Sequence, residues 1–495
     1  MEAMNLSAAA PEIVLLVGAL VVLVADLFVS DRARNVTYAL SLGVLAVVAA
    51  ICGSLLADHA VVYAFGGMYV ADSMTHLLKV VACLLTGLML VYAQGYARDR
   101  EIWKGELFSL SLFVLLGVQV MISANNLLVI YLGLELQSLS LYALIALRRD
   151  DAKATEAAMK YFVLGALASG FLLYGMSMLY GASGTLDINE LARQVGNARV
   201  ASRVALVLGT VFIVAGLGFK LAAVPFHMWV PDVYEGAPTP VAVLISSAPK
   251  LAGFAIAYRM LVEGLLPLAI DWQQMLVLLA VASLFVGNVT AIAQTNLKRM
   301  LAYSTIGQMG FMLLAMLSGV AGGNVSSTAN AYSAALFYVI TYAVTSLGTF
   351  GIIMLLARQG FEAENISDLR GLNKRSPWFA FVMLLLMFSL AGVPPTVGFY
   401  AKLVVLQALL ANGATSGMVW LAVIAVLLSL VGAFYYVRVV RTMYFDEPAD
   451  TTPIVATQDM RIALTFNGLS VIVLGIVPQY LLALCTTAMI RALGG

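Results

Sequence analysis

The sequence predicts an all-α integral membrane protein with about 14 transmembrane helices, and three observations support this fold class. Of the 495 residues, 62% are hydrophobic. Only 11% are Asp, Glu, Lys or Arg, whereas soluble domains carry about 25%, so a water-facing surface could not be covered. Long apolar stretches also recur along the whole chain, each close to the ~20 residues that a helix needs to cross a bilayer.

The apolar stretches follow one another at short intervals, so the elements can be assigned in order. The expected transmembrane helices cover residues 11–30, 36–56, 70–94, 107–123, 126–147, 156–181, 203–229, 239–264, 273–293, 300–320, 329–357, 376–410, 415–441 and 461–489. The connections between them are too short for a soluble domain, so residues 1–495 are expected to form a single membrane domain. The first stretch has no basic region before it and is expected to span, not to be a cleaved signal.

The distribution of basic residues predicts the orientation of the chain. Outside the expected spans, most Lys and Arg fall on one side of the membrane, and only Arg193, Arg199, Arg203 and Arg491 fall on the other. Cytoplasmic loops carry the excess of basic residues. Both termini are therefore expected on the non-cytoplasmic side.

Charge and cysteine content exclude several classes of function. A formal net charge of +1, with no basic tail, argues against nucleic acid as a partner. The three cysteines have no CxxC or Cys/His spacing, and there are only three histidines. No metal site, iron–sulfur cluster or haem is therefore expected in this chain.

Charged residues inside the expected spans are the main functional signal. Glu135 is the one carboxylate deep in a span, and the basic residues are Lys79, Lys160, Lys220, Lys250, Arg259 and Lys402. A charge at a helix centre costs roughly 2.5–3.5 kcal/mol on insertion scales, unless it reaches an interface, finds a partner or faces water. Snorkelling can account for Lys160 and Arg259, which lie near span ends or near a carboxylate. One glutamate cannot neutralise the remaining lysines, and a buried lysine that can lose its proton is a proton carrier.

Prolines stand close to three of these lysines. Pro225 follows Lys220, Pro249 precedes Lys250, and Pro394 and Pro395 precede Lys402. Proline breaks the backbone ladder, and free carbonyls are tolerated at membrane depth only where they face protein or water. Broken helices in two parts of the chain indicate a transporter with its pathway near the midplane. His227 shares a face with Lys220 if the helix continues, and its neutral-range chemistry favours a place in the same pathway.

The motifs around these residues resemble one family over essentially the whole chain. Residues 218–240, which contain Lys220 and His227, resemble the seventh-helix signature of the antiporter-like subunits of respiratory complex I. Residues 296–310 resemble the connection into their tenth helix, and residues 390–402 resemble their broken twelfth helix. Within the family, residues 131–142 and the lysine at 402 are similar to the branch called subunit N. Gln308 departs from the histidine of many relatives and is left out of the expected site.

The resemblance implies a fold and a set of roles. The fold has two inverted five-helix repeats, helices 4–8 (107–264) and 9–13 (273–441), with helices 7 and 12 broken. Three helices (1–106) precede the repeats, and one C-terminal helix (461–489) follows them. Glu135 and Lys220 form a modulating pair, Lys250 and His227 link it to the middle of the membrane, Lys402 is the carrier nearest the outlet, and Lys160 supports the uptake side.

The resemblance also implies partners. The chain is expected to pump protons in the inner membrane of a bacterium, beside the membrane subunits K and M. Flavin mononucleotide, iron–sulfur clusters and quinone are expected in other subunits, with no cofactor in this one. Three alternatives stay open: a subunit of a sodium/proton antiporter or membrane-bound hydrogenase, a stand-alone solute transporter, and a structural subunit whose charges only lock helices.

Overall fold

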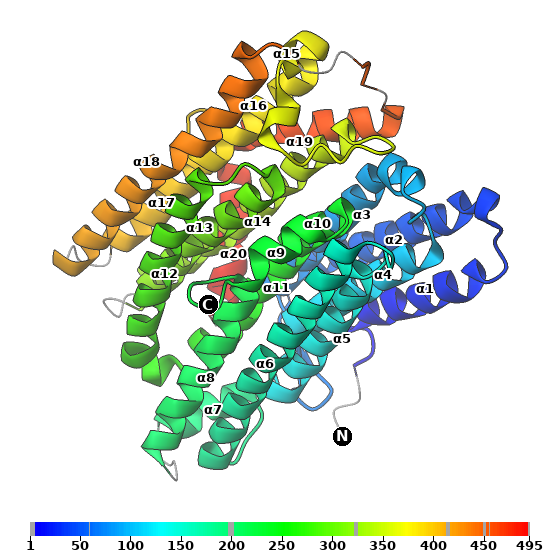
Figure 1. Cartoon of the computed structure of the whole chain (residues 1–495). Coiled ribbons are helices and arrows are strands. Elements are labelled where there is room, and N and C mark those ends of the chain that lie inside the picture. The colour runs from blue at the N-terminus through cyan, green and yellow to red at the C-terminus, as the bar shows by residue number, and fades with distance from the viewer. Residues whose placement is uncertain are drawn as a thin grey trace.

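The structure, a computed structural model, describes residues 5–58, 60–196, 202–320, 325–411, 416–448, 452–454 and 456–493. Its helices lie roughly side by side along most of the molecule (Figure 1). Those of the first part of the chain are α1 (Ala10–Asp26), α2 (Asn35–Asp58), α3 (Ser73–Asp99), α4 (Gly105–Ser123), α5 (Leu127–Ile145), α6 (Ala152–Ser183), α7 (Ile188–Gly196) and α8 (Arg203–Leu221).

The second part of the chain continues the bundle with more interruptions. Its helices are α9 (Trp229–Gly236), α10 (Thr239–Ser246), α11 (Ala248–Ala257), the π-helix η2 (Tyr258–Gly264), α12 (Ala269–Ile292), α13 (Leu297–Ser318), α14 (Val325–Leu356), α15 (Leu372–Arg375), α16 (Pro377–Ala391), α17 (Val397–Ala411), α18 (Ser416–Phe445), α19 (Gln458–Ile476) and α20 (Gln479–Ala492). Short 3₁₀ turns, η1 (Asp31–Ala33), η3 (Leu266–Leu268) and η4 (Ile366–Leu369), lie in the connections.

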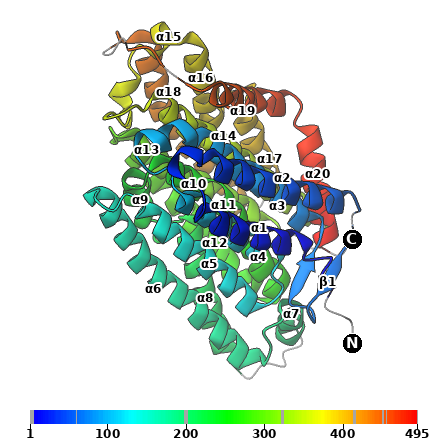
Figure 2. The ribbon, with the colours of Figure 1, turned by 90° about the vertical axis from the view of Figure 1, so that its right-hand side faces the viewer.

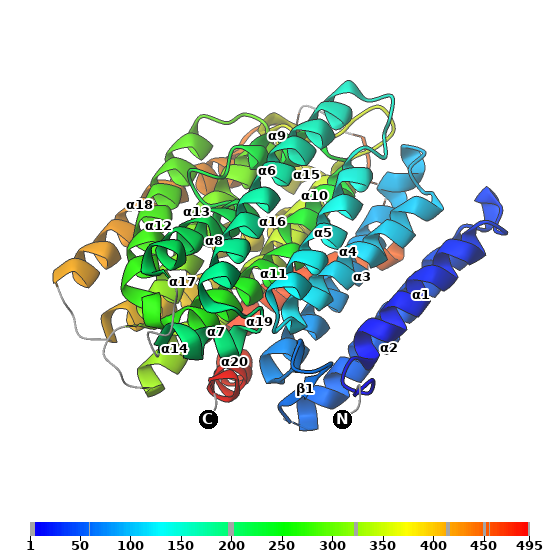
Figure 3. The ribbon, with the colours of Figure 1, turned by 90° about the horizontal axis from the view of Figure 1, so that it is seen from below.

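The all-α membrane fold predicted from the sequence is confirmed. Among the described residues, 12 helical segments are long and apolar enough to cross a membrane. The 17-residue α1 and the shorter apolar pair α16 and α17 fall on the two remaining predicted spans. Figure 3 shows α1 and α2 at one edge of the bundle and α18 at the opposite edge. Both chain ends lie at the same end of the bundle, as an even number of crossings requires (Figures 2 and 3).

Two of the predicted spans are broken by the same local structure. Helix α8 ends before Ala222, which has a left-handed φ of 69°, and α16 ends before Gly392, with a φ of 88°. In the first break the N–H of Ala223 bonds to the carbonyl of Gly218 at 2.7 Å, and in the second that of Val393 bonds to the carbonyl of Phe388 at 2.9 Å. These are Schellman-type helix ends, and the prolines that follow prevent the helix from resuming at once.

Other elements were not foreseen in the sequence. The span expected at 239–264 divides into α10, α11 and the π-helix, and the chain turns sharply at Ser247 (φ −117°, ψ −96°). The single C-terminal helix expected at 461–489 is two helices, α19 and α20, separated at Val477 and Pro478. A small hairpin of β1 (Val62–Ala64) and β2 (Tyr69–Ala71) stands in the connection before α3.

Glycines set the closest helix contacts and so position the polar residues. A Cβ added to Gly117 of α4 would lie 2.6 Å from the backbone nitrogen of Gln137 in α5. A Cβ added to Gly287 of α12 would lie 2.6 Å from the backbone nitrogen of Gly307 in α13. Small residues let membrane helices approach until their backbones touch. The contact between α4 and α5 holds in place the helix that carries Glu135.

Candidate functional site

Lys250 lies against the end of the first broken helix. The last carbonyls of a helix have no partner within the helix. At the end of α8, the Lys250 ammonium donates to the carbonyl of Lys220 at 3.3 Å, and the Trp229 indole N–H donates to that of Phe219 at 3.1 Å. Lys250 is 1% exposed, and its Nζ lies 5.4 Å from the centre of the Trp229 ring. The break therefore binds the lysine from the neighbouring span directly.

The side chain of Lys220 points toward the helix that carries Glu135. Its Nζ donates to the Ser138 hydroxyl at 3.3 Å. Ser138 is one turn after Glu135 on α5, so the two share a face of that helix. The Glu135 carboxylate accepts a hydrogen bond from the Ser169 hydroxyl of α6. In the described part of the chain, Glu135 and Lys220 thus each bond to a serine hydroxyl, and no direct ion pair joins them.

Lys402 lies against the end of the second broken helix. Its Nζ donates to the carbonyls of Leu390 and Ala391, both at 3.0 Å, and to the Ser429 hydroxyl of α18 at 2.9 Å. It also lies 5.1 Å from the centre of the Phe311 ring. Lysine ammonium groups therefore occupy both breaks and satisfy carbonyls that the broken helices leave free.

Gln308, left out of the site on sequence grounds, contacts the same carbonyl as Lys402. Its amide nitrogen donates to the Leu390 carbonyl at 3.0 Å and to the Tyr436 hydroxyl at 3.0 Å. The Tyr338 hydroxyl donates to its amide oxygen. The Tyr436 hydroxyl lies 2.5 Å from that of Ser304. A buried string of amide and hydroxyl groups thus ends beside Lys402, and a glutamine within an apolar span was the only signal for it.

Lys160 is not one of the buried charges. Its side chain is 43% exposed, and it pairs with Glu156 at 2.8 Å and Asp232 at 2.7 Å. Arg299 of α13 reaches the same Asp232 at 2.8 Å. These charges line a hollow of about 190 Å³. Lys160 therefore lies at the mouth of the bundle, in agreement with a snorkelling position.

His227 does not share a helix face with Lys220, because α8 ends at Leu221 and the chain turns before α9. Its Nδ1 is buried and has no hydrogen-bond partner among the described residues. No contact joins His227 to Lys220 or Lys250 within the same ranges. One argument for its place in the pathway, a continuous helix, therefore fails, and the place implied by the family resemblance stays a prediction.

The remaining two charges within the spans have partners that sequence reasoning missed. Lys79 is fully buried and pairs with Glu12 of α1 at 2.5 Å. Arg259 does not snorkel, because its side chain is 2% exposed and pairs with Asp72 at 2.6 Å and Glu263 at 2.5 Å. Glu135 is therefore not the only carboxylate within the membrane bundle. Glu12 and Asp72 lie in other elements, where no sequence spacing brings them to Lys79 and Arg259, whereas Glu263 follows Arg259 by one turn in the same span.

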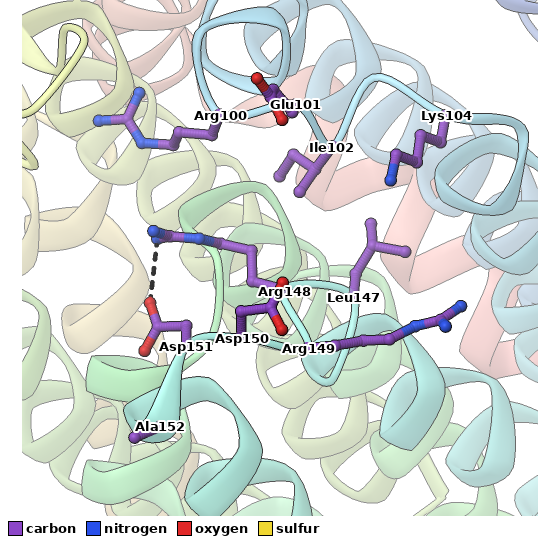
Figure 4. Close-up of a pocket in the computed structure, with 10 residues that line it drawn as sticks. All are labelled: Arg100, Glu101, Ile102, Lys104, Leu147, Arg148, Arg149, Asp150, Asp151 and Ala152. Atoms are coloured by element: carbon purple, nitrogen blue, oxygen red, sulfur yellow. Dashed lines mark ion pairs between the residues drawn. The ribbon is translucent and has the colours of Figure 1, made fainter.

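A further hollow lies in the loops, away from these lysines. It measures about 740 Å³ and is lined by Arg100, Glu101, Ile102 and Lys104 of one loop and by residues 147–152 of another. Figure 4 shows its charged side chains, with Arg148 paired to Asp151. Charged side chains around an open loop hollow are expected at a membrane surface. Within the described ranges, no group of three or more His, Cys, Asp or Glu side chains could hold a metal ion.

Comparisons with known proteins point to one family. Residues 124–431 match the family described as NADH:quinone oxidoreductase/Mrp antiporter, transmembrane. The chain is 60% identical to NADH-quinone oxidoreductase subunit N of Herminiimonas arsenicoxydans, over the full length of both chains. It is 59% identical to the same subunit of Polaromonas naphthalenivorans, over 96% of this chain and 95% of that one. Among solved structures, it is similar to a chain of respiratory complex I from Thermus thermophilus, with a TM-score of 0.80 and 30% identity over 97% of this chain and all of the other.

Proposed function

The chain belongs to the subunit N family of bacterial NADH-quinone oxidoreductase, and on this premise we propose that the lysines at its two helix breaks carry the pumped protons. As a member, it is a proton-translocating, multi-pass subunit of the bacterial inner membrane and works beside other membrane subunits. The observation that supports the relay is the matched pair of breaks. Each leaves backbone carbonyls free within the bundle, and each is bound by a lysine ammonium.

Charge coupling at the first break supplies the switch. A carboxylate close to an ammonium holds the proton on it, and a carboxylate that moves away releases it. Glu135 bonds to Ser169 and Lys220 bonds to Ser138, with no direct ion pair between them in the described ranges, so a small shift between α5 and α8 can change their separation. A change of about 1.4 kcal/mol in this interaction alters the proton occupancy of the lysine tenfold. Lys250 first gives up its own proton, and its neutral amine then accepts the proton from Lys220; the Lys250 Nζ lies 3.3 Å from the Lys220 carbonyl oxygen.

Buried hydroxyl groups in the second half supply the last part of the path to Lys402. The Tyr342 hydroxyl donates to Thr305 at 2.7 Å, one turn from Gln308 on α13. Next in the string, the Tyr338 hydroxyl donates to the Gln308 amide oxygen. The Gln308 amide nitrogen in turn donates to the Leu390 carbonyl, which Lys402 also binds. Because Gln308 does not titrate at neutral pH, we infer that it orients the string while hydroxyl groups and water carry the proton.

Uptake and release are assigned from charge. The exposed Lys160, in a hollow lined by both acidic and basic side chains, stands on the uptake side, and Lys402 is the carrier nearest the outlet. We place both termini on the non-cytoplasmic side, subunits K and M as neighbours, and flavin mononucleotide, iron–sulfur clusters and quinone in other subunits. The full-length identity to subunit N favours this assignment over a sodium/proton antiporter or hydrogenase subunit. No residue here is assigned to NADH or quinone.

Proton pumping driven by NADH oxidation in inverted membrane vesicles tests the relay. The comparison is wild type against Lys220→Ala, after assembly of the complex has been verified. We expect oxidation and pumping to fall together, because a blocked proton step stops the coupled electron transfer. Wild-type rates in an assembled Lys220→Ala complex would show that Lys220 is structural.

A further inference from the structure

A second group of buried charges lies at the end of the bundle that holds both termini, and the lysine relay does not use it. Arg259 of the π-helix η2 pairs with Asp72, which caps the start of α3, and with Glu263, one turn further along η2. The Arg259 guanidinium also donates to Thr75 at 3.1 Å. Asp72 is 1% exposed and Arg259 2%, whereas the Glu263 side chain is 13% exposed. Glu263 is therefore the member of this cluster with access to the outside.

The charges of this cluster do not balance. Two carboxylates face one guanidinium, so the cluster is one positive charge short when both acids are ionised. An uncompensated charge in a low-dielectric interior is costly, and proteins avoid it by binding a proton or a counter-charge. The nearby ion pair of Lys79 and Glu12 is balanced, with a single acid and a single base, and it has no such requirement.

Unpartnered polar atoms surround the same cluster. The Tyr258 hydroxyl, the Arg259 Nε, the Ser73 hydroxyl and the His76 Nδ1 are all buried without a hydrogen-bond partner in the described ranges. Tyr258, Ser73 and His76 are each at most 3% exposed. Polar atoms of this kind are satisfied in native interiors by ordered water. The surroundings of Glu263 are therefore suited to passing protons through water.

The cluster also lies on the same structural element as the relay. Lys250 and Tyr258 are eight residues apart on α11 and its continuation, so they share one helix face. Glu263 lies in the π-helical turn that follows, before the connection to α12. Single π-helical turns are frequent at functional sites, because they displace side chains from the regular spacing.

We propose that Glu263, held by Arg259 opposite Asp72, is a proton-release site for the first half of the bundle. The inference rests on the proposed relay and makes Lys250 a branch point, from which a proton leaves through Glu263 or passes on toward Lys402. In each cycle the Glu263 carboxylate accepts one proton from the bundle side, from the Lys250 ammonium through the Tyr258 hydroxyl and water. It then gives that proton to water at the end of the bundle that holds the termini. Only O–H and N–H bonds form and break, and the carboxylate is restored.

The test is Glu263→Gln in the intact complex, measured as NADH-driven proton pumping and NADH oxidation in inverted vesicles. The substitution keeps the shape of the side chain and leaves a balanced pair of Arg259 and Asp72. The complex should therefore assemble normally, while both rates fall about tenfold because the proton acceptor is lost. Glu263→Asp keeps a titratable acid and should recover at least half of the wild-type rate.

Glu190→Gln is the matched control. Glu190 lies on α7, which packs against η2, and it pairs with Arg193 at 3.1 Å at the surface. Its loss should leave both rates unchanged. Wild-type rates in Glu263→Gln would overturn the inference, and so would failure of that variant to assemble, since Glu263 would then be a structural counter-charge. Lys220→Ala, measured in parallel, separates the hypotheses, because its loss of activity beside an active Glu263→Gln would leave the relay standing and remove only the release site.

Discussion

The two helix breaks are built alike but are served by different lysines. At the end of α8, the ammonium that satisfies a free carbonyl comes from the neighbouring span, as Lys250. At the end of α16, it comes from the second half of the same broken span, as Lys402. The first lysine therefore links two spans, and the second closes one span on itself.

The two breaks also differ in their acids. Glu135 stands one helix turn from the serine that holds Lys220. Among the described residues, no carboxylate pairs with Lys402, which has carbonyls, one hydroxyl and an aromatic ring around it. A lysine without an acid cannot be switched by a local ion pair. We infer that the switch lies in the first half and that the second half receives the proton passively.

The largest effect is expected from removing either lysine that binds a break. Lys250→Met and Lys402→Met should each lower NADH-driven pumping and oxidation tenfold or more, about 1.4 kcal/mol on the barrier. If the two halves act in series, the double variant should lose no more than the more damaging single variant, since steps of one pathway are not additive. Rates are measured in vesicles with equal amounts of assembled complex.

Additive losses in the double variant would contradict the expectation that the two halves act in series. If each single variant kept about half of the pumping and the double variant lost nearly all of it, the halves would be parallel channels. Lys374→Met, a surface control that removes only an exposed pair with Glu447, should leave the rates unchanged.

A smaller effect is expected at the residues that end the two broken helices. Gly392→Ala forces a methyl group into a left-handed backbone, and its Cβ would lie 3.0 Å from Cδ of Lys402. We expect a loss of about 1 kcal/mol in stability. Ala222→Gly relieves the same backbone strain but loses a fully buried methyl group, so its net change should be close to zero. The temperature of dissociation of the purified complex measures both, and equal changes for the two variants would contradict this account of backbone strain at the helix ends.

The fold could be predicted largely from the sequence, because apolar length alone defines a span in lipid. The broken helices near Pro225 and Pro394 also followed from the sequence, since proline removes a backbone donor. The division at Pro478 was missed because the apolar stretch continues on both sides of it. The sharp turn at Ser247 was missed because Pro249 and Lys250 do not indicate how far the chain bends.

The candidate site could be predicted only in part. Burial of Lys220 and Lys250 and their approach to each other follow from an expensive charge beside a helix break. Partners from distant spans could not be foreseen, because pairs such as Lys79 with Glu12 depend on how helices pack. Lys160 was expected inside a span and lies at the mouth of the bundle. This difference of a few residues is smaller than a boundary drawn from hydropathy can resolve. The roles of all the site residues stay predictions.

Removing the serine at each lysine should sharpen the contrast between the halves. Ser138→Ala takes away the hydroxyl that holds Lys220 on the side of Glu135, and pumping should fall about three- to fivefold, or under ~1 kcal/mol. Ser429→Ala leaves Lys402 with two carbonyl acceptors, so a fall of less than about twofold is expected. Vesicle pumping assays compare the two variants side by side. A larger effect at Ser429 would place the sensitive charge in the second half.

The smallest effect concerns the contacts of Glu362 outside the membrane, where Arg148 of the first half also donates to its carboxylate at 3.2 Å. Glu362, in the connection after α14, accepts hydrogen bonds from Arg100 at 2.9 Å and from Tyr96 at 2.8 Å. Burial alone would raise the pKa of Glu362, but Arg100 outweighs it and lowers the pKa below its ordinary value. A lowered pKa in the folded state stabilises the protein above the ordinary glutamate pKa of about 4.3, and this stabilisation is lost as the pH falls through the folded value. Glu362→Gln should therefore reduce thermal stability by a constant small amount near pH 7, and the difference from wild type should vanish on acidification below about pH 4. A difference that instead grew on acidification would mean that Glu362 is protonated in the folded state and that this contact does not join the halves by charge.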